Sequence, residues 1–177
     1  MHYTFETSYN QETLSVMAKC LRKTVRKTRS RKSHIFGWFV VALAVALPFI
    51  SGEEGFVINF KTIITWSAGI AIVIALLFED RLNGYFARKR MLKGTEKAVS
   101  IFDTENIVTF SSETAIGKSE FAYDKIAAVA ETNDYFVFVF SENHAQVYNK
   151  RSMTGGTVDE FRCFISEVTA KAIVTVA

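Results

Sequence analysis

The sequence predicts an α+β membrane protein in which a two-helix transmembrane hairpin carries a small antiparallel-sheet domain closed by a C-terminal helix. Three observations indicate this class. Two long apolar segments, the first uncharged and the second with a single lysine, lie in the first half of the 177-residue chain. Short β-prone segments separated by turn residues fill the second half, and an amphipathic helical pattern follows them. A mean hydropathy of +0.15 with only 22% charged residues excludes a disordered chain.

The two apolar segments are each long enough to cross a bilayer. From Ser33 the chain runs for twenty residues without a charge, which matches a hydrocarbon core of roughly 30 Å and a helical rise of about 1.5 Å per residue. The second segment, residues 56–78, holds only Lys61, whose long side chain can reach the interface. We therefore predict transmembrane helices at 34–52 and 56–78 with an extracytoplasmic loop at 53–55. The alternative is a pair of buried helices in a soluble protein, but the remaining chain is too short to surround them.

The distribution of Lys and Arg predicts the orientation of this hairpin. Residues 1–34 hold eight basic side chains and residues 79–97 hold six, whereas residues 51–55 hold none. Basic residues next to a span stay on the cytoplasmic side. We therefore expect a multi-pass protein of the cell membrane with both termini in the cytoplasm.

Small side chains recur at helical spacing along both predicted spans. Such rows allow helix backbones to approach closely in lipid. They indicate either packing within the hairpin or a dimer face. The residues are Ala42, Ala46, Ser67, Ala71 and Ala75.

Residues 1–33 are predicted to form a strand and a basic amphipathic helix. Residues 3–7 alternate in polarity, and whether this strand joins the C-terminal sheet is left open. Between Asn10 and Lys32, apolar residues recur every three or four positions. The other faces are basic, and they either contact anionic lipid or fix the topology while the helix packs on the cytoplasmic domain, which is the favoured reading. These basic residues are Lys19, Arg22, Lys23, Arg26 and Arg29.

Residues 79–96 are predicted to be a juxtamembrane helix and linker, with Gly94 placed to end the helix. If this helix continued the second span, it would hold the following domain about 20 Å above the membrane.

Residues 97–177 are predicted to form the cytoplasmic domain. Short strands are expected at 97–102, 107–112, 114–116, 119–123 and 126–131. The segment Tyr135–Phe140 has no polar face, which indicates a central strand covered on both sides, and Ala145–Asn149 is its expected hairpin partner. Thr157 and Glu160 fit a capping box that begins a closing helix. A meander or small open barrel closed by one helix is, by analogy, the arrangement of a pleckstrin-homology-like domain.

Four segments of this domain carry a family resemblance. They are Phe121–Ile126, Glu131–Phe136, Tyr148–Met153 and Val158–Arg162. With two spans after a basic leader, they resemble the YcxB-like family of small bacterial membrane proteins. The resemblance implies this architecture and a YcxB-like domain at 97–177, and it implies no catalytic residue.

The sequence offers no recognisable catalytic, metal or cofactor site. Its three histidines and two cysteines are scattered, and Gly155-Gly156 lacks a phosphate-binding frame. Residues 98–177 carry eleven acidic and six basic side chains, a net charge of −5, which argues against nucleic acid as a ligand. The candidate contacts of this domain for a lipid headgroup or a peptide are Lys118, Lys125, Lys150 and Arg151.

We therefore expect a non-enzymatic integral protein of the inner or plasma membrane that presents a cytoplasmic interaction or sensing module. Its expected partners are the lipid bilayer and either another protein or a second copy of the chain. Two alternatives stay open: a membrane-disrupting or ligand-gated two-span effector, and an accessory or immunity subunit of a membrane complex.

Overall fold

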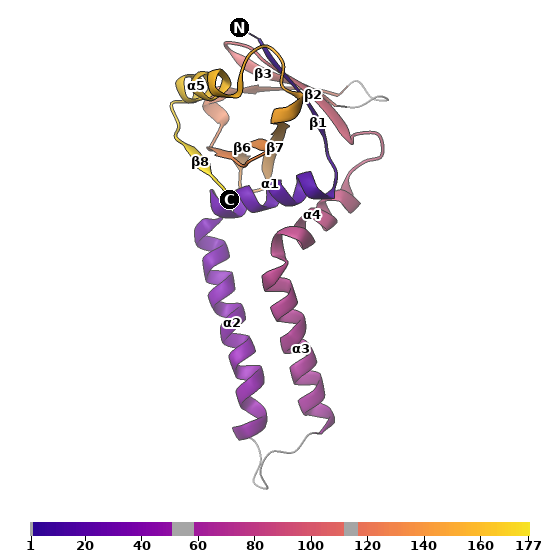
Figure 1. Cartoon of the computed structure of the whole chain (residues 1–177). Coiled ribbons are helices and arrows are strands. Elements are labelled where there is room, and N and C mark those ends of the chain that lie inside the picture. The colour runs from indigo at the N-terminus through magenta and orange to yellow at the C-terminus, as the bar shows by residue number, and fades with distance from the viewer. Residues whose placement is uncertain (1, 51–58, 112–116) are drawn as a thin grey trace.

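A computed structural model describes residues 2–50, 59–111 and 117–177, and these residues form a head carried on a stalk of two helices (Figure 1). The stalk consists of α2 (Lys27–Ile50) and α3 (Phe60–Leu77), which lie side by side. The head contains two sheets and α5 (Val158–Thr169). Two further helices, α1 (Gln11–Lys23) and α4 (Glu79–Arg90), lie where head and stalk meet. The α+β class is therefore confirmed.

The first sheet is antiparallel throughout and joins the N-terminal strand to three strands that follow the stalk. Its strands are, in spatial order, β1 (Tyr3–Ser8), β2 (Lys97–Phe102), β3 (Asn106–Ser111) and β4 (Gly117–Ala122). Pairing of β1 with β2 runs from Tyr3 opposite Phe102 to Ser8 opposite Lys97. The N-terminal strand, which precedes both stalk helices, therefore completes a sheet built after them.

The second sheet is antiparallel, as expected, except for one parallel pair that the sequence did not predict. Its spatial order is β7 (His144–Asn149), β6 (Tyr135–Ser141), β5 (Ala128–Glu131) and β8 (Ile173–Thr175). Strand β8 runs parallel to β5, which the crossover through α5 makes possible. The chain therefore ends on a strand beyond α5. Ala170 ends that helix in the left-handed conformation, with φ of 52°.

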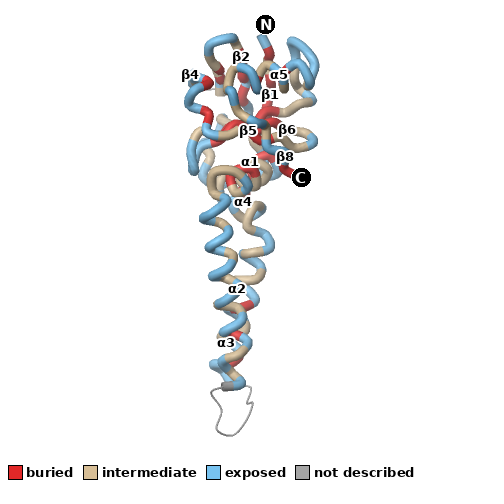
Figure 2. Tube along the Cα trace, turned by 90° about the vertical axis from the view of Figure 1, so that its left-hand side faces the viewer, coloured by how far each residue is buried: buried red, intermediate tan, exposed pale blue. Residues whose placement is uncertain are grey.

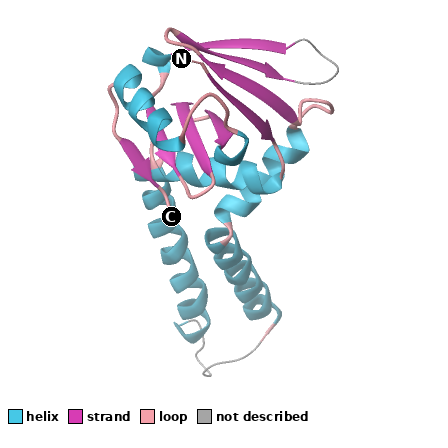
Figure 3. Ribbon diagram, turned by 45° about the horizontal axis from the view of Figure 1, so that its top comes forward, coloured by secondary structure: helices cyan, strands magenta, loops and turns pink. Residues whose placement is uncertain are grey.

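Figure 3 shows the two sheets of the head and the helices around them. The predicted central strand is confirmed, because β6 lies between β7 and β5 and both of its faces are buried. Phe136 and Phe138 pack in an aromatic core beneath α5, together with Phe161. Val137 and Val139 point to the opposite face and pack in a smaller core that includes residues of α1. The capping box of α5 is also present, since Thr157 and Glu160 bond each other's backbone amides.

The basic amphipathic segment does not form one helix to Lys32. Helix α1 begins after the Asn10 cap and ends at Lys23, and α2 begins at Lys27 in a different direction (Figure 1). A continuous helix could not both bury Leu14 and Leu21 against the head and run down the stalk. The turn between the two helices resolves this conflict.

The continuous helix considered after the second span is also absent. Phe78 ends α3 and precedes α4, which turns aside and packs against α1. The head therefore packs directly on α1, and no helix of about 20 Å separates it from the end of α3.

The stalk exposes its apolar side chains, whereas the buried residues gather in the head (Figure 2). Helices α2 and α3 are both long and apolar enough to cross a membrane. Only 6% of the apolar stretch of α2 and 11% of that of α3 is buried. The ends predicted for the spans at 51–52 and 56–58, the loop at 53–55 and the strand at 114–116 lie outside the described residues.

Candidate functional site: the collar between head and stalk

We use the term collar for α1, α4 and residues 26–34, which are Arg26 and the first residues of α2. Within it, α1 and α4 cross at a glycine. A methyl group at Gly84 would lie 2.7 Å from the backbone nitrogen of Ser15 and 2.9 Å from its Cα atom. Ser15 in turn donates its hydroxyl to the carbonyl of Gln11 at 2.7 Å. Only a residue without a side chain permits this approach.

Charged side chains tie the three helices of the collar together. Arg22 on α1 donates two hydrogen bonds to Asp80 on α4, Nε to Oδ1 at 2.8 Å and Nη2 to Oδ2 at 2.5 Å. This hydrogen bonding raises the pKa of Arg22. Glu79 lies next to the pair, 3.7 Å from Arg22, and its Oε2 atom is 2.8 Å from His34 Nε2 on α2. The carboxylate of Glu79 on α4 thus contacts both α1 and α2.

A second set of contacts joins the start of α2 to the head. Arg26 donates from Nε to the carbonyl of Glu142 at 2.5 Å and from Nη2 to Oδ1 of Asn143 at 2.8 Å. Arg29 lies 3.5 Å from the Glu142 carboxylate. Both acceptors belong to the turn between β6 and β7, so the collar holds the head from its stalk side.

The five basic residues proposed to contact anionic lipid therefore differ in what they do. Arg22, Arg26 and Arg29 bind groups of the protein itself. Lys23 is exposed, and Lys19 is half-buried beside α3 and α4. The apolar face of α1 packs under the second sheet, as the favoured reading of this helix predicted.

The four cations proposed for a headgroup or peptide do not form one site. Each pairs with a nearby acid: Lys118 with Glu120 at 3.6 Å, Lys125 with Asp124 at 2.9 Å, Lys150 with Glu131 at 2.6 Å and Arg151 with Asp134 at 2.8 Å. Lys150 is nearly buried, with its side chain 12% exposed, and also donates to the carbonyl of Thr132. Its place is structural.

Glu131 forms an ion cluster that sequence reasoning missed. Besides Lys150, it accepts two hydrogen bonds from Arg162, Nε to Oε2 at 2.9 Å and Nη2 to Oε1 at 2.7 Å. These bonds hold the pKa of Glu131 below its ordinary value despite its burial. Glu131 ends β5 and Arg162 lies on α5, so the cluster fixes the helix to the sheet. Partners 31 residues apart leave no periodic signal.

The two stalk helices approach each other along residues other than the predicted small ones. Ala44 and Gly69 are buried, and a methyl group at Gly69 would lie 3.4 Å from the Cβ atom of Ala44. A methyl group at Gly37 would lie 2.9 Å from Leu76. By contrast, the predicted packing residues lie away from this contact: Ala42, Ser67, Ala71 and Ala75 are exposed and Ala46 is half-buried. These five residues therefore do not hold the hairpin together, and the dimer-face alternative stays a prediction.

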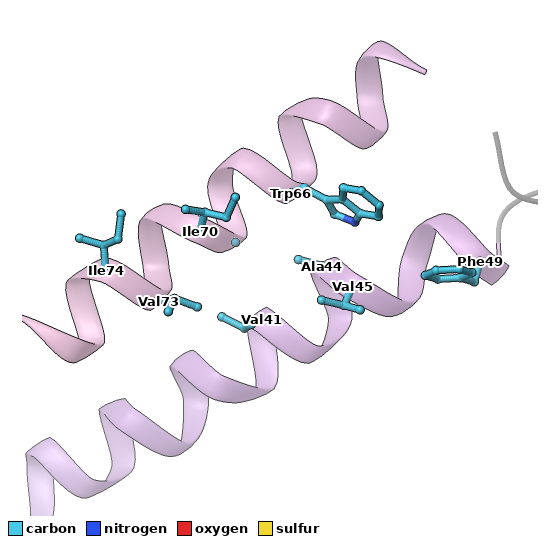
Figure 4. Close-up of a pocket in the computed structure, with 9 residues that line it drawn as sticks. Val41, Ala44, Val45, Phe49, Trp66, Ile70, Val73 and Ile74 are labelled. Carbon is cyan, nitrogen blue, oxygen red and sulfur yellow. The ribbon is translucent and has the colours of Figure 1, made fainter. Parts of the chain in front are cut away.

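Towards its far end the stalk has an apolar cavity of about 420 Å³ between its helices, and this cavity is open on one side (Figure 4). Val41, Val45 and Phe49 line it from α2, and Trp66 and Ile70 line it from α3. The cavity lies alongside the Ala44–Gly69 contact. The helices therefore touch tightly only in part and leave a gap that apolar groups can fill.

A family model described as YcxB-like protein matches residues 102–165 of the chain. The match runs from the last residue of β2 through β7 into α5, and it includes all four segments on which the resemblance was based. The resemblance is therefore confirmed for this segment. A search of curated proteins finds no match.

Proposed function

We propose that the protein is a non-enzymatic, two-span membrane protein whose YcxB-like head serves as a cytoplasmic interaction or sensing module. In this proposal α2 and α3 cross the bilayer of the cell membrane, both termini are cytoplasmic, and the collar fixes the head to the membrane face.

The observation that carries the proposal is the exposure of the stalk. Large apolar side chains cover its outer surface, among them Phe36 at 68% exposed and Ile70 at 61% exposed. An apolar surface of this extent is not stable in water. Hydrocarbon chains would cover it without cost, because all backbone groups of a helix bond within the helix.

The charge distribution supports the orientation. Basic residues gather around the collar, including Arg31 and Lys32 on α2 and Arg88, Lys89 and Arg90 on α4. Basic residues at the end of a span favour the cytoplasmic side. The far end of the stalk would then face outwards.

The topology of the head supports a pleckstrin-homology-like fold. A four-stranded sheet is followed by strands β5, β6 and β7 of a second sheet and then by the capped helix α5. The hairpin and collar are inserted between β1 and β2. A head with a hairpin inserted inside its first sheet would move as one unit with the spans.

The exposed small residues support a second copy of the chain as a partner. Ser67, Ala71 and Ala75 follow one another at intervals of four, on the side of α3 away from Gly69. Small residues at this spacing favour helix association in lipid. The head, with its net negative charge, fits a protein or lipid partner and not nucleic acid.

Native cysteines provide the test. Cys163 on α5 is exposed, whereas Cys20 is buried, and that burial raises its pKa to about 12. A membrane-impermeant maleimide should label Cys163 only after cells are permeabilised, and the protein should resist alkaline extraction from membranes. The variant Cys163→Ser should remain unlabelled in both conditions. Labelling of Cys163 in intact cells, or release of the protein by alkali, would overturn the proposal.

A further inference from the structure

A hollow of about 370 Å³ opens where the stalk meets the collar. Val16 and Lys19 line it from α1, Leu77 and Phe78 line it at the end of α3, and Asp80 and Arg81 line it from α4. Leu77 is the last residue of the apolar helix. If α3 crosses the bilayer, the hollow therefore lies at the level of the lipid headgroups.

The hollow carries two cations that the protein does not neutralise. The acidic residue that lines the hollow, Asp80, is paired with Arg22, which donates hydrogen bonds to both of its carboxylate oxygens. Within the described part of the chain, neither Lys19 nor Arg81 forms an ion pair with an acidic side chain. The guanidinium of Arg81 lies 5.9 Å from the centre of the Phe78 ring. The lining thus combines positive charge with an apolar wall.

The apolar wall continues down the stalk. Ile70, Ile74 and Leu77 succeed one another at intervals of four and three, so they lie on one side of α3. Their side chains are 61%, 50% and 66% exposed. This stripe leads from the hollow to the interhelical cavity, which Ile70 and Ile74 also line.

We propose that the hollow holds the headgroup phosphate of an anionic phospholipid from the cytoplasmic leaflet. Lys19 and Arg81 contact the phosphate, and an acyl chain follows Ile70, Ile74 and Leu77. Two cations favour a headgroup with net negative charge over a zwitterionic one. The apolar stripe favours a lipid over a soluble phosphate. This inference rests on the membrane insertion proposed above.

The test uses the full chain purified in detergent. Native mass spectrometry measures the binding of phosphatidylglycerol, and phosphatidylcholine with the same acyl chains serves as the comparison. Each cation near an anionic lipid surface contributes roughly 1 kcal/mol, so Lys19→Gln or Arg81→Gln should weaken phosphatidylglycerol binding about fivefold and the double variant about thirtyfold. Lys19→Arg with Arg81→Lys should restore it.

A matched control removes the same charge from the same two helices. Lys23 on α1 and Arg88 on α4 are exposed and do not line the hollow. The double variant Lys23→Gln/Arg88→Gln should weaken phosphatidylglycerol binding much less than Lys19→Gln/Arg81→Gln does. Circular dichroism of every variant checks that the fold is retained.

Three results would overturn the inference. They are equal binding of the two lipids by the wild type, an equal loss in the control variant, and displacement of the lipid by inorganic phosphate at similar concentration. Alkaline extraction of the same variants shows whether the chain is inserted in the membrane, and it therefore tests the proposed function independently of lipid binding. A chain that stays in the membrane without lipid preference contradicts only the inference, whereas a chain released by alkali contradicts both.

Discussion

The collar and the stalk are both helix pairs made by the same two stretches of chain, yet they are held by different forces. In the collar, α1 and α4 meet at Gly84 and are joined by the Arg22–Asp80 pair. In the stalk, α2 and α3 meet through Ala44 and Gly69 and leave an apolar cavity beside that contact. The comparison indicates that a charge pair reinforces a close crossing next to the head, whereas the Ala44–Gly69 contact of the stalk is one of shape.

The largest effect is expected when a bulky side chain is introduced at the helix crossing of the collar. Gly84→Val places a branched side chain against the backbone of Ser15, so the helices must separate. We expect a loss of about 3 kcal/mol in the free energy of unfolding. Thermal unfolding in detergent measures it.

Asn83→Val is the control for this change. Asn83 is exposed on the same helix, so this variant places a valine beside the same crossing without the clash. A similar loss in both variants would contradict the close crossing.

Acidification should destabilise the head and leave the stalk unaffected. The pKa of Glu131 is lowered in the folded protein by Arg162 and Lys150, so its stabilising effect is present above the unfolded pKa of about 4.3. It is lost as the pH falls through the lower folded value, because the unfolded chain binds the proton first.

We therefore expect the head to lose stability in acid through this cluster, while the apolar contact of α2 with α3 is unchanged. Tryptophan fluorescence reports the stalk, since both tryptophans lie there, and near-ultraviolet circular dichroism of the tyrosines reports the head and the collar. The Glu131→Gln variant should show a smaller acid dependence. An unchanged dependence would remove Glu131 from the explanation.

A smaller loss is expected when the collar loses its charge pair. Arg22→Ala leaves the carboxylate of Asp80 without its partner in a position only 21% exposed. We expect a cost of about 2 kcal/mol, less than for a fully buried pair. Arg29→Ala breaks the exposed pair with Glu142 and should cost well under 1 kcal/mol, as measured by the same unfolding experiment. Equal costs would mean that the two pairs are equally screened by water.

Small effects are also expected in the stalk, and they distinguish its two faces. Gly69→Leu forces α3 away from Ala44 and should cost about 1 kcal/mol of stability in the single chain. Ala71→Leu changes the outer face and should leave that stability unchanged while lowering the yield of crosslinked dimer in membranes. The opposite result for the two variants would reverse the assignment of the faces.

Local patterns predicted local structure well. Strand β2 covers the expected residues 97–102, the capping box at Thr157 is present, and the unbroken apolar run at Tyr135 became the central strand. These features depend on neighbours in sequence or on simple burial. The short strand β8 has no such signal, because three residues acquire their conformation only by pairing with β5.

Pairwise geometry could not be predicted in the same way. Spacing showed that Ser67, Ala71 and Ala75 share one side of a helix, but not that this side lies away from α2. Spacing likewise placed Lys19 and Arg22 on one basic helix, but not which of them would meet Asp80. Which residues pair depends on how the chain packs around an inserted hairpin, and one helix viewed alone does not contain that information.

The most direct test of the account measures where the stalk lies. Nitroxide labels are attached to cysteines at Ile70, in the stalk, and at Lys23, in the collar, in a Cys20→Ala/Cys163→Ser background reconstituted in bilayers. Relaxation by oxygen reports lipid, and relaxation by a water-soluble nickel complex reports water. We predict that the label at Ile70 responds to oxygen and is shielded from nickel, whereas the label at Lys23 responds to nickel. Strong relaxation of the Ile70 label by nickel would contradict the central claim.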